Sequence, residues 1–315
     1  MYYPYFRGKL YDLITIRENA ELLATNNFIP IVEPVKQTLN GLTKTIEAIN
    51  TVQGEMILIV NPTYGDHVGD CKALNDLLLD TFKSNSNILV GILLSQTTTI
   101  TDIQSICDLH KNSRRIAFIH NGFTNTSDLN TYIHSRIQNF LHIFIEKNGG
   151  KLYRGKFKDT TRILVRDSFE KRANRAYEDT ERFSELHLTY QDEGMDGFGD
   201  FLIVSDEFSE SGGPAYAVAI HITFIDTDDD DVMHIHHFKS DRFDTPTDPA
   251  GKFAEALAKL DREVNSGISK VKKTDAILEF LDLKSRGHFP GLGYVKKLSM
   301  QHHLETIADF FSTKR

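Results

Sequence analysis

Short apolar runs rich in β-branched residues recur along this chain, and they limit the folds open to it more than any other feature. The first five begin about 25–30 residues apart, with helix-like sequence between them. Continuous apolar runs of this length are typical of strands that are buried on both faces of a parallel sheet. The runs are residues 28–32, 56–60, 88–94, 116–119, 141–145, 163–165, 201–204 and 216–224.

Eight such runs predict an α/β fold, a single (β/α)8-type (TIM-like) barrel with helices between its strands. A further strand, residues 232–238, follows the last run after the charged turn 228–231, which predicts an added β-hairpin. Residues 249–264 and 276–314 have the spacing of C-terminal helices. No long linker interrupts the pattern, so we interpret residues 1–315 as one β/α-barrel domain.

Other segments are expected to complete this fold. Residues 1–10 are interpreted as an aromatic, basic lead-in, and residues 184–192 as extended. Residues 169–177 are expected to form a charged helix. Apolar residues at helical spacing predict five further helices at residues 12–24, 41–50, 70–82, 101–110 and 127–137.

Charge and cysteine content exclude several classes of protein. The formal net charge of −8 argues against a nucleic-acid footprint over the whole domain, although a local basic patch is compatible with it. Cys71 and Cys107 have neither metal-site nor disulfide spacing, which predicts a reducing, cytoplasmic location. The start does not resemble a signal peptide, and no run of eighteen apolar residues occurs, so no membrane association is expected.

Polar or charged residues follow most of the apolar runs. In a parallel barrel the carboxyl ends of the strands meet at one rim, where barrel enzymes place their chemistry. Two of these residues, Asn61 and Asp167, are predicted to bind substrate there. The expected rim residues are Glu33, Asn61, His120, Glu146, Arg166, Asp167 and Asp206.

The predicted catalytic residues are Glu33, His120, Arg166 and Asp206. Carboxylates and a histidine in one pocket can perform acid–base chemistry, with Arg166 steering a phosphate. Glu33, Glu146 and Asp206 are the predicted ligands of a divalent metal, Mg²⁺ or Mn²⁺. The alternative is that these residues cap helices and pair with one another. Glu33 also precedes a proline, which by itself favours extended backbone.

A basic cluster lies between residues 151 and 175, interleaved with aromatic residues. Cationic groups with aromatic neighbours suit single-stranded nucleic acid or the phosphate of a nucleotide. A helix over residues 169–177 would place Lys171 and Arg175 one turn apart, and we predict that both bind substrate. The alternative is a solvated face that is balanced by neighbouring acidic residues.

Three blocks of sequence carry a resemblance to a known family. They are YYPYFRGK at residues 2–9, IPIVEPVK at residues 29–36, and GFGDFLIVSDEFSESGGPAYAVAIHITFID with IHHFKSDRFDTPTDPAGKF between residues 197 and 253. Together they resemble a bacterial family that is distantly similar to the phage-related "beta family" proteins. The resemblance spans nearly the whole chain. It implies a barrel-like fold, a gene setting among mobile elements or in anti-phage defence, and a separately encoded nuclease-like companion, but no particular reaction.

Two functions therefore stay open. One is a metal-dependent phosphodiesterase or nuclease-like hydrolase in anti-phage defence or a mobile element. The other is a non-catalytic recognition subunit whose separately encoded partner performs the chemistry. An enzyme would gather the predicted catalytic residues in one concave pocket, whereas a recognition subunit would show a binding surface without that convergence.

Overall fold

The computed structural model describes residues 1–135, 140–210 and 213–314. The chain divides into two compact units, and each is described by itself. The first unit comprises Met1–Asp167 and Thr189–Phe201, and the second comprises Ser168–Leu188 and Leu202–Arg315. The single domain over residues 1–315 stays a prediction.

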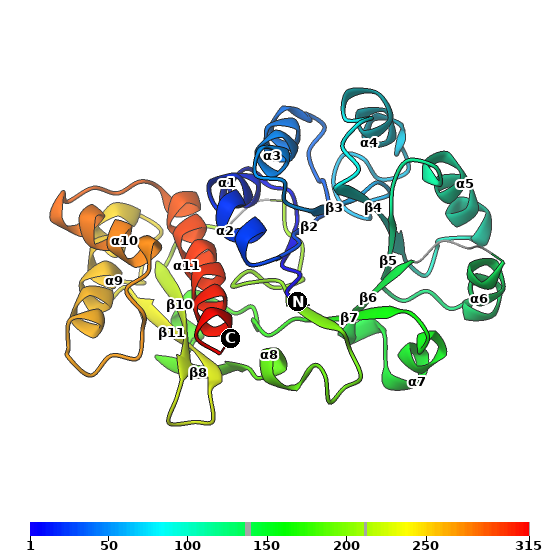
Figure 1. Cartoon of the computed structure of the whole chain (residues 1–315). Helices are drawn as coiled ribbons and strands as arrows, with labels where there is room; N and C mark the ends of the chain where they lie inside the picture. The colour runs from blue at the N-terminus through cyan, green and yellow to red at the C-terminus, as the bar shows by residue number, and fades with distance from the viewer. Residues whose placement is uncertain (136–139, 211–212, 315) are drawn as a thin grey trace. The chain divides into compact units, whose positions relative to one another are not determined.

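The first unit is built around a parallel eight-stranded sheet that curves into a nearly closed barrel, with helices on its outer side (Figure 1). From β1 to β7 each strand pairs in parallel with the next strand along the chain, and β7 pairs in parallel with β9. The predicted (β/α)8-type barrel is therefore confirmed. Its strands are β1 (Tyr5–Phe6), β2 (Ile31–Val32), β3 (Met56–Ile59), β4 (Ile88–Leu94), β5 (Ile116–His120), β6 (Leu141–Ile145), β7 (Thr161–Arg166) and β9 (Gly197–Asp200).

The barrel closes where the N-terminal segment lies beside β9. Tyr2 forms a parallel bridge with Phe198. The Tyr3 N–H donates to the Phe198 carbonyl at 2.8 Å, and the Phe198 N–H donates to the Met1 carbonyl at 3.0 Å. A Cβ atom at Gly199 would lie 2.1 Å from the Tyr3 carbonyl oxygen, so this approach requires glycine.

Three expectations about the strands are wrong. Residues 1–10 are more than a lead-in, because β1 lies within them. Residues 201–204 form a turn after β9, in which Leu202 has a φ of 51°. Phe201, Leu202 and Ile203 are buried, so the apolar run reflects burial and not a strand. Residues 216–224 contribute to a second sheet outside the barrel.

Alternate residues of each strand point into the barrel or outward to the helices. Gly91 of β4 faces inward, because a Cβ atom added there would lie only 3.0–3.1 Å from side-chain atoms of the inward-facing Ile57, Ile59 and Ile119. The inward-facing residues form one apolar core that consists of Tyr3, Tyr5, Ile29, Ile31, Ile57, Ile59, Leu89, Leu93, Ala117, Ile119, Ile143, Ile145, Ile163, Val165 and Phe201. This alternation decides which polar residues can reach the barrel interior.

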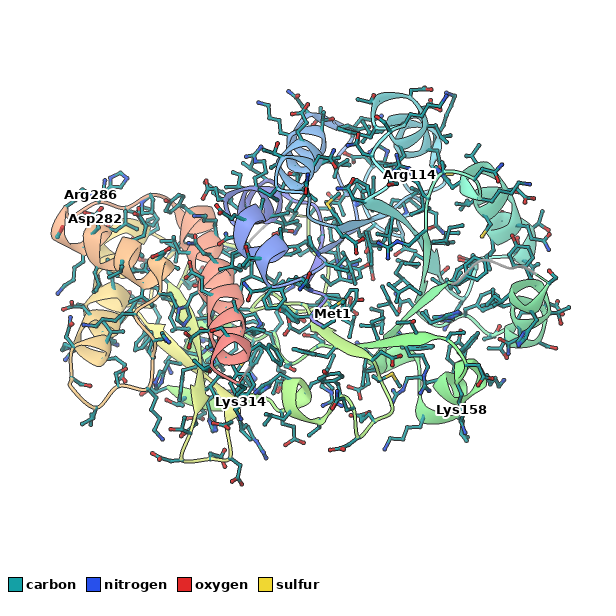
Figure 2. The ribbon with its side chains drawn as sticks, viewed as in Figure 1. Met1, Arg114, Lys158, Asp282, Arg286 and Lys314 are labelled. Carbon is teal, nitrogen blue, oxygen red and sulfur yellow. The ribbon has the colours of Figure 1, made fainter. Side chains whose placement is uncertain are left out.

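The helices of the first unit follow the predicted order, with local breaks. The expected helix over residues 12–24 is divided at Asn19, and residues 136 and 137 of another expected helix lie outside the described residues. The buried Arg114 before β5 is labelled in Figure 2. The helices are α1 (Leu10–Glu18), α2 (Ala20–Thr25), α3 (Asn40–Thr51), α4 (Lys72–Asp76), η1 (Leu77–Thr81), α5 (Ile100–His110), α6 (Thr126–His134), η2 (Glu146–Asn148), α7 (Lys151–Arg154) and η3 (Gly155–Phe157).

The second unit combines a three-stranded antiparallel sheet of order β10-β11-β8 with helices (Figure 1). The hairpin and the C-terminal helices are confirmed. Residues of β10 and of the three long helices share one apolar core. The elements are η4 (Asn174–Ala176), β8 (Thr180–Ser184), α8 (Leu186–Thr189), where the chain returns to the first unit, β10 (Ala219–Asp226), β11 (Val232–Lys239), α9 (Pro249–Val264), α10 (Asp275–Ser285) and α11 (Leu292–Thr313).

Two expectations in this unit are wrong. Residues 169–177 form a helical turn only at η4. Arg172 bonds to Glu181 and Asn174 to the Ala217 carbonyl, and such tertiary contacts override helix propensity. The extended segment lies at β8, where Thr180 pairs with His236 of β11, and not over residues 184–192. No helix in the described ranges combines the length and hydropathy that crossing a membrane requires.

Candidate functional site

Glu33 follows β2, and its carboxylate is fully buried. It accepts hydrogen bonds from the Tyr5 hydroxyl at 2.7 Å, and from the N–H and the hydroxyl of Thr63 at 2.9 and 3.1 Å. The Arg7 guanidinium forms an ion pair with it. Arg7 also lies over the Tyr64 ring, 4.8 Å from its centroid. The charge of Glu33 is thus neutralised by a buried partner and by neutral donors, as in a structural ion pair.

A cavity of about 760 Å³, here called the rim cavity, lies among the loops that follow β3, β4, β5 and β6. This is the face on which (β/α)8 proteins build their sites. Asn61, predicted to bind substrate, lines the rim cavity. Its amide accepts a hydrogen bond from the Leu93 N–H (2.8 Å) and donates to the Leu93 carbonyl (2.9 Å), so it joins β3 to β4.

His120 ends β5 on the outer side of the barrel wall, where it is fully buried. One ring nitrogen lies 2.7 Å from the Tyr153 hydroxyl and the other 2.9 Å from Nδ1 of His142. Burial, and then the neighbouring His142, hold the pKa of His120 well below its usual range. Burial lowers the pKa of His142 to about 3. Both rings are therefore neutral at pH 7, and neither lines the rim cavity.

Arg166 ends β7 and forms an ion-pair cluster with two glutamates. Its Nε and Nη2 donate to Glu146 at 2.6 and 2.8 Å, and Nη2 also donates to Glu193 at 2.6 Å. The hydrogen bonds from Arg166 lower the pKa of the Glu146 carboxyl. Asp167, the next residue, is exposed and lines neither cavity discussed here.

The predicted catalytic residues occupy different surroundings. Glu33 lies in the barrel interior, and His120 lies on the outer side of the barrel wall beside Tyr153 of α7. Arg166 lies in its ion-pair cluster, and Asp206 belongs to the second unit. Among residues 1–135, 140–210 and 213–314, no three His, Cys, Asp or Glu side chains form a group that could hold a metal. The site of Glu33, Glu146 and Asp206 with Mg²⁺ or Mn²⁺ stays a prediction.

The second unit contains a cavity of about 690 Å³, here called the basic cavity. Four cationic residues line it: Lys171, Arg172, Arg175 and Lys296. No Asp or Glu is among the lining residues that the structure describes. Although the chain as a whole carries a net charge of −8, this local concentration of positive charge favours an anionic ligand.

The cationic side chains of the basic cavity differ in the ion pairs that they already form. Arg172 donates to Glu181 at 2.7 Å and to Glu170 at 2.6 Å, which fixes its guanidinium. Lys171 lies 3.8 Å from Glu207, a long contact. Arg175 is exposed and forms no ion pair within the described part of the chain. A ligand can therefore engage Arg175 without breaking an ion pair of the described residues.

The segment 213–219 forms another wall of the basic cavity and is held in place from two sides. Lys252 of α9, which is 1% exposed, donates to the carbonyls of Ala215 at 3.2 Å and Tyr216 at 2.7 Å. The Asn174 amide donates to the Ala217 carbonyl at 2.8 Å. The Tyr216 side chain remains 48% exposed on this fixed segment, so its ring is available to a ligand.

Uncharged aromatic rings complete the basic cavity. Phe169 and Tyr177 are buried and line it together with His221. Nδ1 of His221 lies 2.6 Å from Nδ1 of His237, and the Tyr177 ring stacks on His237 at 4.4 Å. Burial lowers the pKa of His221 to about 3 and that of His237 to about 4, so both are neutral at pH 7.

The sequence predicts Lys171 and Arg175 as neighbouring site residues, but it does not indicate Lys296 or Tyr216. Lys296 lies on α11, more than a hundred residues further along the chain, and no local pattern connects it to the cluster. The apolar run predicts a strand that begins at Tyr216, although the Gly-Pro pair at residues 213 and 214 is a turn signal. Arg7 is not predicted as a site residue either, although it lies on the same face of an extended segment as Tyr3 and Tyr5, two residues further along.

The fold and the cavity together define a class: a (β/α)8-type barrel protein with a second α/β unit that carries a basic, aromatic cavity. A scan against protein-family models finds no match to this chain, and a search of the curated proteins finds none either.

Proposed function

We propose that this protein is a recognition protein that binds a phosphate-bearing nucleotide group in the basic cavity of its second unit. The group comes either from single-stranded nucleic acid or from a free nucleotide. The observation that carries this proposal is the set of four cations and no described carboxylate around one cavity of an acidic chain. Arginine and lysine side chains form charge-assisted hydrogen bonds with phosphate oxygens.

The uncharged part of the basic cavity supports the same ligand. The half-exposed ring of Tyr216 provides a face on which a base can stack. A volume of about 690 Å³ is in the range of cavities that bind small organic molecules. Phosphate contacts would fix the ligand and stacking would add affinity with little sequence preference.

The surroundings of the predicted catalytic residues favour recognition over hydrolysis. The charge of Glu33 is neutralised by Arg7, and His120 is buried among aromatic rings with a lowered pKa. Arg166 is engaged by two glutamates. Chemistry would then belong to the separately encoded nuclease-like companion that the sequence resemblance implies. The metal-dependent hydrolase and the setting in anti-phage defence or a mobile element stay predictions.

Equilibrium binding of a fluorescein-labelled oligothymidylate and of AMP tests this proposal on the full chain. We expect dissociation constants of about 1–100 µM for the preferred ligand, with the oligonucleotide bound more tightly than AMP if the source is nucleic acid. Tyr216→Ala should weaken binding about 5–100-fold and Tyr216→Phe should not, because stacking needs only the ring. Failure of both ligands to bind, or equal binding by Tyr216→Ala, would overturn the proposal.

A further inference from the structure

The rim cavity of the first unit has a charge opposite to that of the basic cavity. Its described lining contains two carboxylates, Asp70 and Asp102, and no Lys or Arg. Asp102 is already engaged by the N–H and the hydroxyl of Thr99, and one oxygen of Asp70 accepts from the Lys72 N–H at 3.0 Å. With this charge balance, the rim cavity disfavours phosphates and other anions.

The neutral part of the lining offers unused hydrogen-bonding groups of both kinds. The Asn148 side-chain NH₂ donates to Oδ1 of Asn121 at 2.6 Å. This leaves the side-chain NH₂ of Asn121 and Oδ1 of Asn148 without further bonds in the described ranges. The exposed Gln96 amide forms no hydrogen bond to any described residue. Donors and acceptors therefore lie together in one cavity.

An aromatic ring supplies an apolar face beside these amides. Tyr64 lines the rim cavity and is 36% exposed. One face of its ring lies against the Arg7 guanidinium, 4.8 Å from the centroid, and Arg7 is fixed by its ion pair with Glu33. Glu33 therefore holds Arg7 in place, and Arg7 in turn holds the Tyr64 ring. Glu33 is thus a positioning residue for the Tyr64 ring of this cavity.

We infer that the rim cavity binds an uncharged ligand whose ring carries vicinal hydroxyls, the chemistry that a free sugar and the ribose of a nucleoside share. Each hydroxyl both donates and accepts, which matches the amides of Asn121, Asn148 and Gln96. The C–H face of such a ring packs on an aromatic side chain such as Tyr64. A cavity of about 760 Å³ accommodates a ligand of one or two rings. This site is separate from the phosphate site and does not depend on it.

Saturation-transfer NMR and calorimetry on the full chain test this inference with D-glucose, D-galactose, D-ribose, adenosine and uridine. We expect a dissociation constant of about 0.1–10 mM for at least one probe, as is usual for small ligands held by a few hydrogen bonds. Binding of the free sugars identifies a saccharide as the source, and binding of the nucleosides alone identifies a nucleoside.

Two variants keep the inference falsifiable. Gln96→Ala should weaken binding of that probe about tenfold, whereas Gln104→Ala, the same change on α5 outside the lining, should not. Tyr64→Leu should weaken it by a similar factor through loss of the ring. Gln96 and Tyr64 are both exposed, so these substitutions should leave the fold intact, and thermal unfolding serves as the folding control. Absence of binding by all five probes, or equal binding by the Gln96→Ala protein and wild type, would overturn the inference.

Discussion

The Asn174 side chain donates a hydrogen bond of 2.8 Å to the backbone carbonyl of Ala217, and this bond joins two walls of the basic cavity. Asn174 belongs to the segment that carries Lys171 and Arg175, whereas Ala217 follows the exposed ring of Tyr216. The bond therefore fixes the phosphate-binding cations relative to the ring on which a base would stack.

Replacing this side chain should affect stability and binding together. Asn174→Ala removes the bond and should lower the free energy of unfolding by about 1 kcal/mol, the usual contribution of a neutral hydrogen bond. Affinity for the oligonucleotide should fall several-fold, because the walls are no longer joined. Asn265→Ala, which removes exposed side-chain bonds to Asp261 and Lys273, is the control. Urea unfolding and anisotropy check both effects, and unchanged binding by Asn174→Ala would argue against a fixed cavity.

Lys252 should be more important for stability than an ordinary lysine. Its buried ammonium donates to backbone carbonyls of Ala215, Tyr216 and Thr245. Lys252→Met keeps the length of the stem but leaves these carbonyls unsatisfied, which should lower the free energy of unfolding by about 3 kcal/mol. Lys259→Met, on the same helix but a third exposed, should lower it by less than about 1 kcal/mol. Equal effects in urea unfolding would contradict this role for Lys252.

The ion pair of Glu33 with Arg7 gives a prediction that separates a structural role from a catalytic one. Glu33→Gln leaves the Arg7 charge buried and uncompensated, so the free energy of unfolding should fall by about 3–5 kcal/mol. The same substitution at Glu55, whose pair with Arg115 is exposed, should change it by about 1 kcal/mol or less. A Glu33→Gln protein as stable as wild type would show that the pair is not structural.

Continuous burial explains which strands could be predicted. The apolar runs at β4 and β6 have the bounds that the sequence predicts, because every residue of the run is enclosed or nearly so. β9 has the sequence Gly-Phe-Gly-Asp, and its glycines are needed for the approach of Tyr3 rather than for strand propensity. No rule based on β-branched residues can find such a strand.

The candidate site could be predicted only where its residues are close in sequence. Lys171 and Arg175 belong to one basic segment of the sequence, whereas Lys296 comes from the C-terminal helix. His120 shows a different difficulty. The sequence predicts that His120 follows a strand ending at Ile119, but β5 includes His120. Because side chains alternate along a strand, His120 then points to the outer face.

Buried histidines should make the protein sensitive to acid. Burial lowers the pKa of His142 to about 3 and those of His110 and His302 to about 4, below the ordinary value of 6.5. At a pH between the folded-state pKa and 6.5, the unfolded chain binds more protons at these histidines than the folded protein does. The stability present above pH 6.5 is therefore lost as the pH falls toward 4. Each group should contribute a loss of about 2 kcal/mol between pH 7 and pH 5.

Urea unfolding at both pH values measures this loss. The loss should shrink by about 2 kcal/mol in His142→Phe, which keeps a ring in the aromatic cluster. His134→Phe, a change at an exposed position, should leave it unaltered. Stability that is constant or rises between pH 7 and pH 5 would contradict the burial of neutral histidines.

The salt dependence of oligonucleotide binding tests the central claim most directly. If the basic cavity neutralises phosphates, the logarithm of the affinity should fall linearly with the logarithm of the NaCl concentration, and Arg175→Ala should reduce the slope by about one. Arg262→Ala removes an exposed arginine of the same unit that does not line the cavity, and it should keep the slope of wild type. An affinity that does not depend on salt, or equal slopes for wild type and Arg175→Ala, would contradict phosphate recognition by this cavity.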